Sequence, residues 1–196
     1  MPRSLPATLA GLGALGALTD RVLRRMEDDY TRSGELQPGT VAAMYGTYAG
    51  HTTAFAWAAT RRVWPVSLPR RAAVIAGTVA TAAGAGTMAA GMGRFDSAAQ
   101  LSGTDTGSLH DHGIYRYSRN PQYLGAVVGL GGIALATRSG LAALLTAGVF
   151  ATYRRWIPSE ERVLHRTFGH DYDHYAATAA RWWGRSIRDD KDHSHA

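Results

Sequence analysis

Uncharged stretches alternate with polar ones along this chain, and four of the uncharged stretches are long enough to form apolar helices. Residues 40–60 and 72–92 contain no Asp, Glu, Lys or Arg, and each is close to the roughly 20 residues that a helix needs to cross a bilayer. Residues 123–137 and 140–153 are shorter and are separated only by Arg138 and Ser139. They predict a helical hairpin whose crossing requires tilt or local thinning of the bilayer. The pattern predicts an all-α integral membrane protein with about four transmembrane helices.

A further helix is predicted before these stretches, because apolar residues recur there at helical spacing and form one face. These residues are Leu5, Leu9, Leu12, Leu15, Val22 and Met26. The helix runs into the basic residues Arg21, Arg24 and Arg25, with no convincing signal-peptide cleavage site before them. We therefore expect an N-terminal amphipathic or anchor helix, whose composition fits both a span and a position on the membrane surface.

Composition narrows the class of protein. A chain of 196 residues fits one domain, which we place at residues 1–186, followed by a polar tail at 187–196 that is expected to be disordered. The absence of cysteine excludes disulfides, thiolate metal sites and a cysteine nucleophile. The net charge of +6 arises from arginines scattered through the loops. This scatter argues against nucleic-acid binding, which favours a basic stripe with interleaved aromatic residues.

The positions of the arginines predict the orientation in the membrane, because arginines near span ends favour the cytoplasm. The loops of residues 19–39 and 93–120 and the segment after residue 153 hold most of them. A smaller set lies on the opposite side and comprises Arg61, Arg62, Arg70, Arg71 and Arg138. We expect a protein of the bacterial inner (plasma) membrane, with C-terminal helices and an active site that face the cytoplasm.

The first polar motif is GIYRYSRNPQYLG, at residues 113–125. Asn120 suits the N-cap of a helix and Pro121 its first position. A helix that starts there presents backbone N–H groups and the positive end of its dipole, and Arg119 adds a full charge beside them. The motif therefore predicts a capped helix start that favours a carboxylate or a phosphate.

The second polar motif is IPSEERVLHRTFGHDYDHY, at residues 157–175. Ser159 is a candidate N-cap, which would put Glu160 and Glu161 in the first turn of a new helix, and Gly169 is a candidate end. The structural interpretation is that both acids stabilise the helix dipole. The functional alternative is that one glutamate faces inward and binds ribose hydroxyls or an ammonium group.

Together the two motifs, within residues 93–183, resemble the isoprenylcysteine carboxyl methyltransferase-like family, whose relatives include the phospholipid N-methyltransferases. The first motif matches at Gly113, Tyr115, Arg119, Pro121, Tyr123 and Gly125. The second matches at Glu160, Glu161, Phe168, Gly169, Tyr172 and Tyr175. The chain departs from the family at Asn120, where histidine is commonest, and at Ile114, where proline is common. Without that histidine, the expected mechanism shifts from acid-base chemistry toward positioning of the acceptor.

The resemblance implies an S-adenosylmethionine-dependent methyltransferase that acts on a lipophilic small molecule at the membrane, with carboxyl, thiol and amine acceptors all open. Its implied cofactor-binding residues are Gly113, Tyr115, Arg119, Asn120, Pro121, Tyr123, Gly125, Glu160, Glu161 and Tyr172. Its implied catalytic residues are Arg119, Arg154 and Glu161. Methyl transfer from a sulfonium depends mainly on near-attack positioning and on exclusion of water.

Weaker candidates lie elsewhere. His51 and Tyr48 sit within the first uncharged stretch and are possible substrate contacts, because ionisable residues inside a membrane are often functional. No metal site is expected, because the His and Asp residues at 110–112 and 165–174 lack the spacing of known ligand sets. Membrane lipids are expected partners, and nothing in the sequence indicates an oligomeric state.

Glycines four residues apart predict close helix packing in two of the stretches. The pairs are Gly46 with Gly50 and Gly125 with Gly129.

Two other functions fit the same residues. One is an NADPH-dependent membrane reductase of the sterol-reductase type, which resembles this C-terminal region but is usually longer. The other is a non-catalytic membrane protein that keeps the fold, against which the intact Arg119, Glu160 and Glu161 argue.

Overall fold

The computed structural model describes residues 5–105 and 107–184 as a bundle of helices. Its elements are α1 (Leu5–Arg32), α2 (Pro38–Arg61), α3 (Arg70–Met92), α4 (Ala98–Ser102), the 3-10 turn η1 (Gly113–Arg116), α5 (Pro121–Thr137), α6 (Gly140–Phe168) and α7 (His170–Thr178). No β-strand occurs in the described ranges, so the prediction of an all-α fold is confirmed. The tail at 187–196, for which disorder is predicted, lies outside the described residues.

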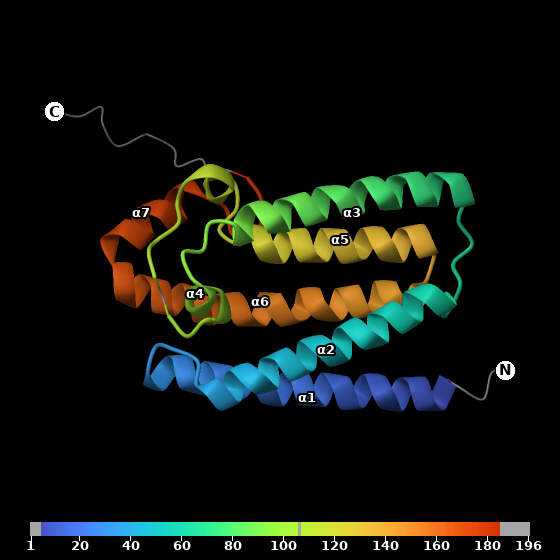
Figure 1. Cartoon of the computed structure of the whole chain (residues 1–196), viewed down its shortest axis with the longest axis horizontal. Helices are drawn as coiled ribbons and strands as arrows, with labels where there is room; N and C mark the ends of the chain where they lie inside the picture. Colours follow the sequence, from blue (N-terminus) through green and yellow to red (C-terminus); the bar gives the residue numbers. More distant parts are fainter. Residues whose placement is uncertain (1–4, 106, 185–196) are drawn as a thin grey trace, which may run out of the picture.

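α6 is the central helix, because it contacts α1, α2, α5 and α7. Figure 1 shows α1 and α2 antiparallel on one side of α6, and the pair α3 and α5 on the other. The short helix α4 and helix α7 gather at one end of the bundle. The opposite end holds the connections from α2 to α3 and from α5 to α6.

The predicted hairpin of α5 and α6 is confirmed. Arg138 ends α5 in the left-handed conformation, with a φ of 55°, and Ser139 starts α6 by accepting a hydrogen bond from the Ala142 N–H at 3.2 Å. The Ser139 hydroxyl also donates to the Val63 carbonyl, with an oxygen–oxygen distance of 2.9 Å. The turn is therefore tied to the end of α2.

Glycines allow α3 and α5 to touch backbone to backbone. A Cβ on Gly84 would lie 2.3 Å from the backbone nitrogen of Gly129, and one on Gly125 would lie 2.4 Å from that of Met88, so neither position accepts a side chain. Close packing at Gly125 is thus confirmed. The same prediction for Gly46 is wrong, because nothing lies within 4 Å of a Cβ placed there.

Among the described helices, α3 is the one that is long and apolar enough to cross a membrane. Its apolar residues face outward: Val74, Ile75 and Val79 are 43%, 65% and 64% exposed, which suits contact with lipid rather than with water. α5 is also apolar but has only 17 residues. Four spans therefore remain a prediction for the bundle as a whole.

The amphipathic pattern predicted for α1 is confirmed from Leu12 onward, since Leu12 and Leu15 pack against one core cluster. Val22, Met26 and Tyr30 are buried and join a core cluster with Met44 of α2 and Trp156 of α6. The start of the helix is open, with Leu5 and Leu9 being 40% and 54% exposed. α1 thus belongs to the packed bundle from Leu12 onward.

The predicted helix start at Ser159 is wrong. α6 runs without a break from Gly140 to Phe168, and Pro158 and Ser159 lie inside it. An internal proline removes one backbone hydrogen bond and its ring crowds the preceding turn, a cost of about 3 kcal/mol. Burial of Trp156 and Ile157 in the core opposes this cost. Glu160 is consequently mid-helix, where the dipole gives it no stabilisation. The predicted end at Gly169 is confirmed.

Candidate functional site

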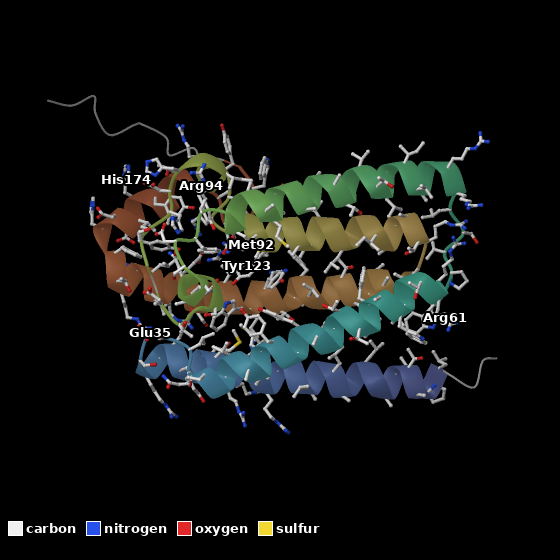
Figure 2. All side chains as sticks on the ribbon, viewed as in Figure 1. Glu35, Arg61, Met92, Arg94, Tyr123 and His174 are labelled. Carbon is white, nitrogen blue, oxygen red and sulfur yellow. The ribbon has the colours of Figure 1, made fainter. Side chains whose placement is uncertain are left out.

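A cavity of about 460 Å³ lies at the end of the bundle where α3 ends and α5 begins. Its walls come from α1, α2, α3, α5, α6 and α7 and from the segment between α3 and η1. Figure 2 shows two of its residues, Met92 and Tyr123, in this half of the molecule, whereas Arg61 marks the far end. The two polar motifs of the sequence thus meet at one cavity.

The first turn of α5 forms one wall. Asn120 is the N-cap and Pro121 the first helical residue, as predicted. The Asn120 side chain does not cap the helix, however, because its Nδ2 donates to the Arg181 carbonyl at 3.1 Å. The first backbone hydrogen bond of the helix runs from the Leu124 N–H to the Asn120 carbonyl, at 3.0 Å. The Tyr123 N–H comes before this bond, among the N–H groups at a helix start that have no acceptor within the helix.

Glu161 is held by two arginines. The Arg119 Nη2 lies 2.8 Å from its Oε1, and the Arg181 Nε lies 3.0 Å from the same oxygen. Arg119 also donates from Nη1 to the carbonyls of Ala176 and Ala179, at 2.8 and 3.0 Å. The carboxylate of Glu161 is therefore compensated, and it fastens α6 to α5 and to the end of α7.

Glu160 has neutral partners only. The Tyr123 hydroxyl donates to its Oε1 at 2.7 Å, and Trp156 gives a second hydrogen bond. No described Arg, Lys or His forms an ion pair with it. Burial raises the pKa of the Glu160 carboxyl to about 7, the two hydrogen bonds oppose this rise, and the neighbouring Glu161 adds to it.

Aromatic rings surround this carboxyl. Tyr123 stacks on Tyr153 with ring centroids 4.4 Å apart, and Tyr30 packs on Trp156 at 4.9 Å. All four side chains line the cavity. An uncompensated carboxylate beside several ring faces is a favourable setting for a cation from which water is excluded.

Two buried polar atoms in the cavity wall have no hydrogen-bond partner among the described residues. They are the Tyr172 hydroxyl and the His110 Nε2. Tyr172 is only 5% exposed, and an unsatisfied buried polar atom is costly unless something else bonds to it. The cavity therefore has the features of a site for a polar molecule: these two atoms, the Glu160 carboxyl without a cationic partner, and a volume typical of ligand pockets.

Comparison with known families agrees with this geometry. The family described as phospholipid methyltransferase matches residues 72–171, about half of the chain. The chain belongs to the phospholipid methyltransferase family. The match runs from α3 to the start of α7 and so includes Tyr123, Glu160 and Glu161. Neither a search of curated proteins nor one of solved structures found a match.

Membership of the phospholipid methyltransferase family confirms the relationship predicted from the two motifs and implies a methyltransferase of membrane-lipid-like substrates. The structure brings most of the predicted site residues to the cavity. Those that line it are Tyr48, Tyr115, Arg119, Asn120, Tyr123, Glu160, Glu161 and Tyr172.

Three predicted residues shape the site without lining it. Gly113 has a φ of 63° and lies under the Arg94 guanidinium, Pro121 packs against Gly91 of α3, and Gly125 touches α3. His51 lines a second, smaller cavity. Arg154 is exposed and lies over the Phe150 ring at 5.9 Å, so the structure does not bring it to the main cavity.

Sequence reasoning missed several residues of the site. Arg181 carries no motif, and its pairing with Glu161 depends on the path of the chain after α7. Tyr30, Tyr153 and Trp156 belong to apolar helix faces that resemble ordinary core. The helical spacing of Trp156 and Glu160, four residues apart on α6, is the one signal that could have linked them.

Proposed function

We propose that the chain is an S-adenosylmethionine-dependent methyltransferase that acts on a lipophilic acceptor at the membrane. The observation that carries the proposal is Glu160, a carboxyl without a cationic partner, inside an aromatic cavity of the segment that matches the family. The unpaired carboxyl and the rings suit positive charge, and both the cofactor and an amine acceptor carry it.

The residues present fit this cofactor. The start of α5 and its Tyr123 N–H suit a carboxylate, and the Tyr172 hydroxyl and His110 Nε2 offer hydrogen bonds that no described residue uses. Bound there, S-adenosylmethionine supplies a methyl group on a sulfonium. Arg119 and Glu161 act as positioning residues, because they hold α5 and α6 at a fixed separation.

Glu160 is the group we assign to proton transfer. An acceptor amine or thiol must lose a proton to complete methylation, and a general base works best when its pKa is near the working pH. A carboxyl with a pKa of about 7 meets that condition. This assignment favours amine or thiol acceptors over a carboxylate, which has no proton to lose. The Asn120 departure from the family pattern matters less if the base is on α6.

We further propose that α2, α3, α5 and the first half of α6 span the membrane, with the cavity on the cytoplasmic side. The uncharged stretches lie in these four helices. The cavity lies at the end of the bundle opposite the connections from α2 to α3 and from α5 to α6, and that end carries most of the arginines. The second half of α6, with Glu160, then lies outside the hydrocarbon. A bacterial inner membrane is the setting we expect.

The test is calorimetric titration of the purified full-length protein in detergent with S-adenosylmethionine and, separately, with NADPH. We expect binding of the first alone. Arg119→Gln should weaken it by about tenfold or more, from loss of hydrogen bonds to charged groups, whereas the matched variant Arg154→Gln should bind like the wild type. Binding of NADPH alone would support the reductase alternative, and binding of neither would contradict an enzyme of either kind.

Methyl transfer is tested next, with cofactor labelled in the methyl group and a membrane-lipid extract as the acceptor source. We expect label in a lipid fraction with the wild type and with Arg154→Gln. Cofactor binding without any labelled product, across extracts from several sources, would favour a non-catalytic protein.

A further inference from the structure

A second cavity, of about 250 Å³, lies beside the main one. Its walls come from α1, α2, α5 and α6. Tyr48 and Tyr153 line both cavities, so the two spaces meet at this pair of rings. From there the second cavity follows the uncharged parts of α2 and α6, as far as Phe55 and Leu145.

The walls of the second cavity are apolar. Phe55, Leu130, Leu145 and Val149 supply hydrocarbon surface. Four threonines also line it. Thr52 is one of them, and the hydroxyls of the other three donate to carbonyls of their own helices. These bonds run from Thr19 to Leu15, from Thr47 to Met44 and from Thr152 to Gly148, at 2.9, 2.7 and 2.9 Å. Three of the four threonine hydroxyls are therefore already used, and the cavity is mainly suited to an apolar ligand.

One imidazole breaks this pattern. The Nδ1 of His51 lies 3.2 Å from the Thr47 carbonyl, and because a carbonyl only accepts, Nδ1 is the donor. In the neutral ring, Nε2 is then left as an acceptor. His51 thus adds one hydrogen-bond acceptor to a wall that is mainly apolar.

An apolar space of this size is destabilising when nothing fills it, because the lining side chains lose their packing partners. It also adjoins the cavity of the proposed reaction, since Tyr48 and Tyr153 line both. These two facts point to a ligand that occupies both cavities and that is polar at one end and apolar at the other.

We infer that the second cavity holds a hydrocarbon chain of the acceptor, which passes between Tyr48 and Tyr153 while the reacting head lies in the main cavity. The inference rests on the proposed function for the identity of that head. It assigns Val149 and Leu145 as the residues that limit the bulk of the chain.

The test is photo-crosslinking of the full-length protein in detergent, without turnover. The probe is lysophosphatidylethanolamine that carries a diazirine near the end of its acyl chain. Mapped by mass spectrometry of peptides, the label is expected on residues 47–55 and 145–152. Label confined to the outer face of α3, around Val74 and Val79, would overturn the inference, because it would show surface lipid only.

A filled cavity gives an independent check. Val149→Phe adds bulk inside the cavity and should lower the label at residues 47–55 by about tenfold, the scale of steric exclusion from a fitted pocket. Leu144→Phe is the matched control on the same helix, because Leu144 is 49% exposed and does not line the cavity. Equal labelling of both variants would overturn the inference. The wild-type label map decides the question even if Val149→Phe fails to fold.

Titration of the same samples with S-adenosylmethionine separates this inference from the proposed function. Cofactor binding with no label in the second cavity would remove the chain site and leave the methyltransferase. Label in the second cavity without cofactor binding would leave the chain site and remove the methyltransferase.

Discussion

Glu160 and Glu161 are neighbours in the chain, but their carboxylates have opposite kinds of partner. Glu161 accepts hydrogen bonds from the guanidinium groups of Arg119 and Arg181, whereas Glu160 accepts them from the neutral Tyr123 and Trp156. Consecutive residues on a helix point about 100° apart, which is why one reaches the arginines and the other the aromatic cavity. We therefore assign a structural role, the linkage of α6 to α5 and to the end of α7, to Glu161, and the proton-transfer role to Glu160.

Glu160→Gln should remove the pH dependence of methyl transfer near neutrality. In the wild type, activity should rise with pH through about 7 as the carboxyl loses its proton and becomes able to accept one. The variant keeps a hydrogen-bonding side chain but no base, so its rate at pH 8 should fall by about 100-fold or more. The measurement is the rate against pH at saturating cofactor. If the rate of the variant still rose with pH through about 7, as the acid limb of the wild-type profile does, the assignment would be contradicted.

The same substitution should stabilise the fold at high pH. Because burial raises the pKa of Glu160 from 4.5 to about 7, the folded state favours the protonated form, and stability falls as pH rises through this range. This rise in pKa corresponds to a loss of about 3 kcal/mol in the free energy of unfolding above pH 7. Glu160→Gln should thus unfold at a higher temperature than the wild type at pH 8, and at nearly the same temperature at pH 4.5. A variant less stable than the wild type at pH 8 would speak against a desolvated carboxyl without a cationic partner.

Tyr123→Phe tests the hydrogen bond to Glu160. The Tyr123 hydroxyl lowers the pKa of that carboxyl, so its loss should raise the pKa and move the acid limb of activity to higher pH. A hydrogen bond of about 1.4 kcal/mol corresponds to about one pH unit. Tyr175→Phe serves as the control, because its hydroxyl donates to the Tyr115 carbonyl at 3.0 Å and not to Glu160. A shift toward lower pH in Tyr123→Phe would contradict this account.

Glu161→Gln should loosen the contact between α6, α5 and the end of α7. The side chains of Glu161 and Arg119 are only 15% and 14% exposed, and removal of one member of a buried ion pair leaves the other uncompensated. We expect a loss of about 2 kcal/mol or more in the free energy of unfolding, together with weaker cofactor binding. Arg24→Gln breaks an exposed pair with Asp20 and should cost less than about 1 kcal/mol. Cofactor binding at wild-type strength by Glu161→Gln would remove its positioning role.

Gly84→Ala should separate α3 from α5. The added Cβ would lie 2.3 Å from the backbone nitrogen of Gly129, and backbone cannot yield as a flexible side chain can, so a loss of about 1–3 kcal/mol is expected. Gly86→Ala, on the same helix, has nothing within 4 Å of its new Cβ and should be neutral or stabilising by up to about 1 kcal/mol. Thermal unfolding in detergent compares the two. Equal unfolding temperatures would contradict the close contact.

Local signals in the sequence predicted much of the fold. The turn at Arg138 and Ser139, the start of α5 at Pro121 and the end of α6 at Gly169 all follow from residues that act on their own backbone. Ser159 misled the prediction for the opposite reason: tertiary burial of the residues around it outweighs its local preference for an N-cap. Capping preference predicts a helix start at Ser159, whereas packing in the core keeps the helix continuous.

The site was predictable as a set of motif residues but not as an arrangement. The sequence identified both glutamates, and their separate roles depend on Arg181, which reaches Glu161 only after α7 has turned the chain back. The cavity walls from α1 and α2 were equally hidden, because Tyr30 and Tyr48 come from segments far from the motifs. The glycine contacts of α3 lie seven residues apart, at Gly77, Gly84 and Gly91. The prediction relied on glycines four residues apart and therefore did not include them.

Because α6 continues through Pro158, one helix lines both cavities and sets the distance between them. Val149, which lines the second cavity, and Glu160, in the main one, lie on the same continuous helix, about 16 Å apart along its axis at 1.5 Å per residue. A broken helix would let that separation drift, whereas an unbroken one fixes it. In the reaction that we propose, the length of the acceptor, as much as its head group, would decide whether the reacting atom reaches the Glu160 carboxyl while the chain lies beside Val149.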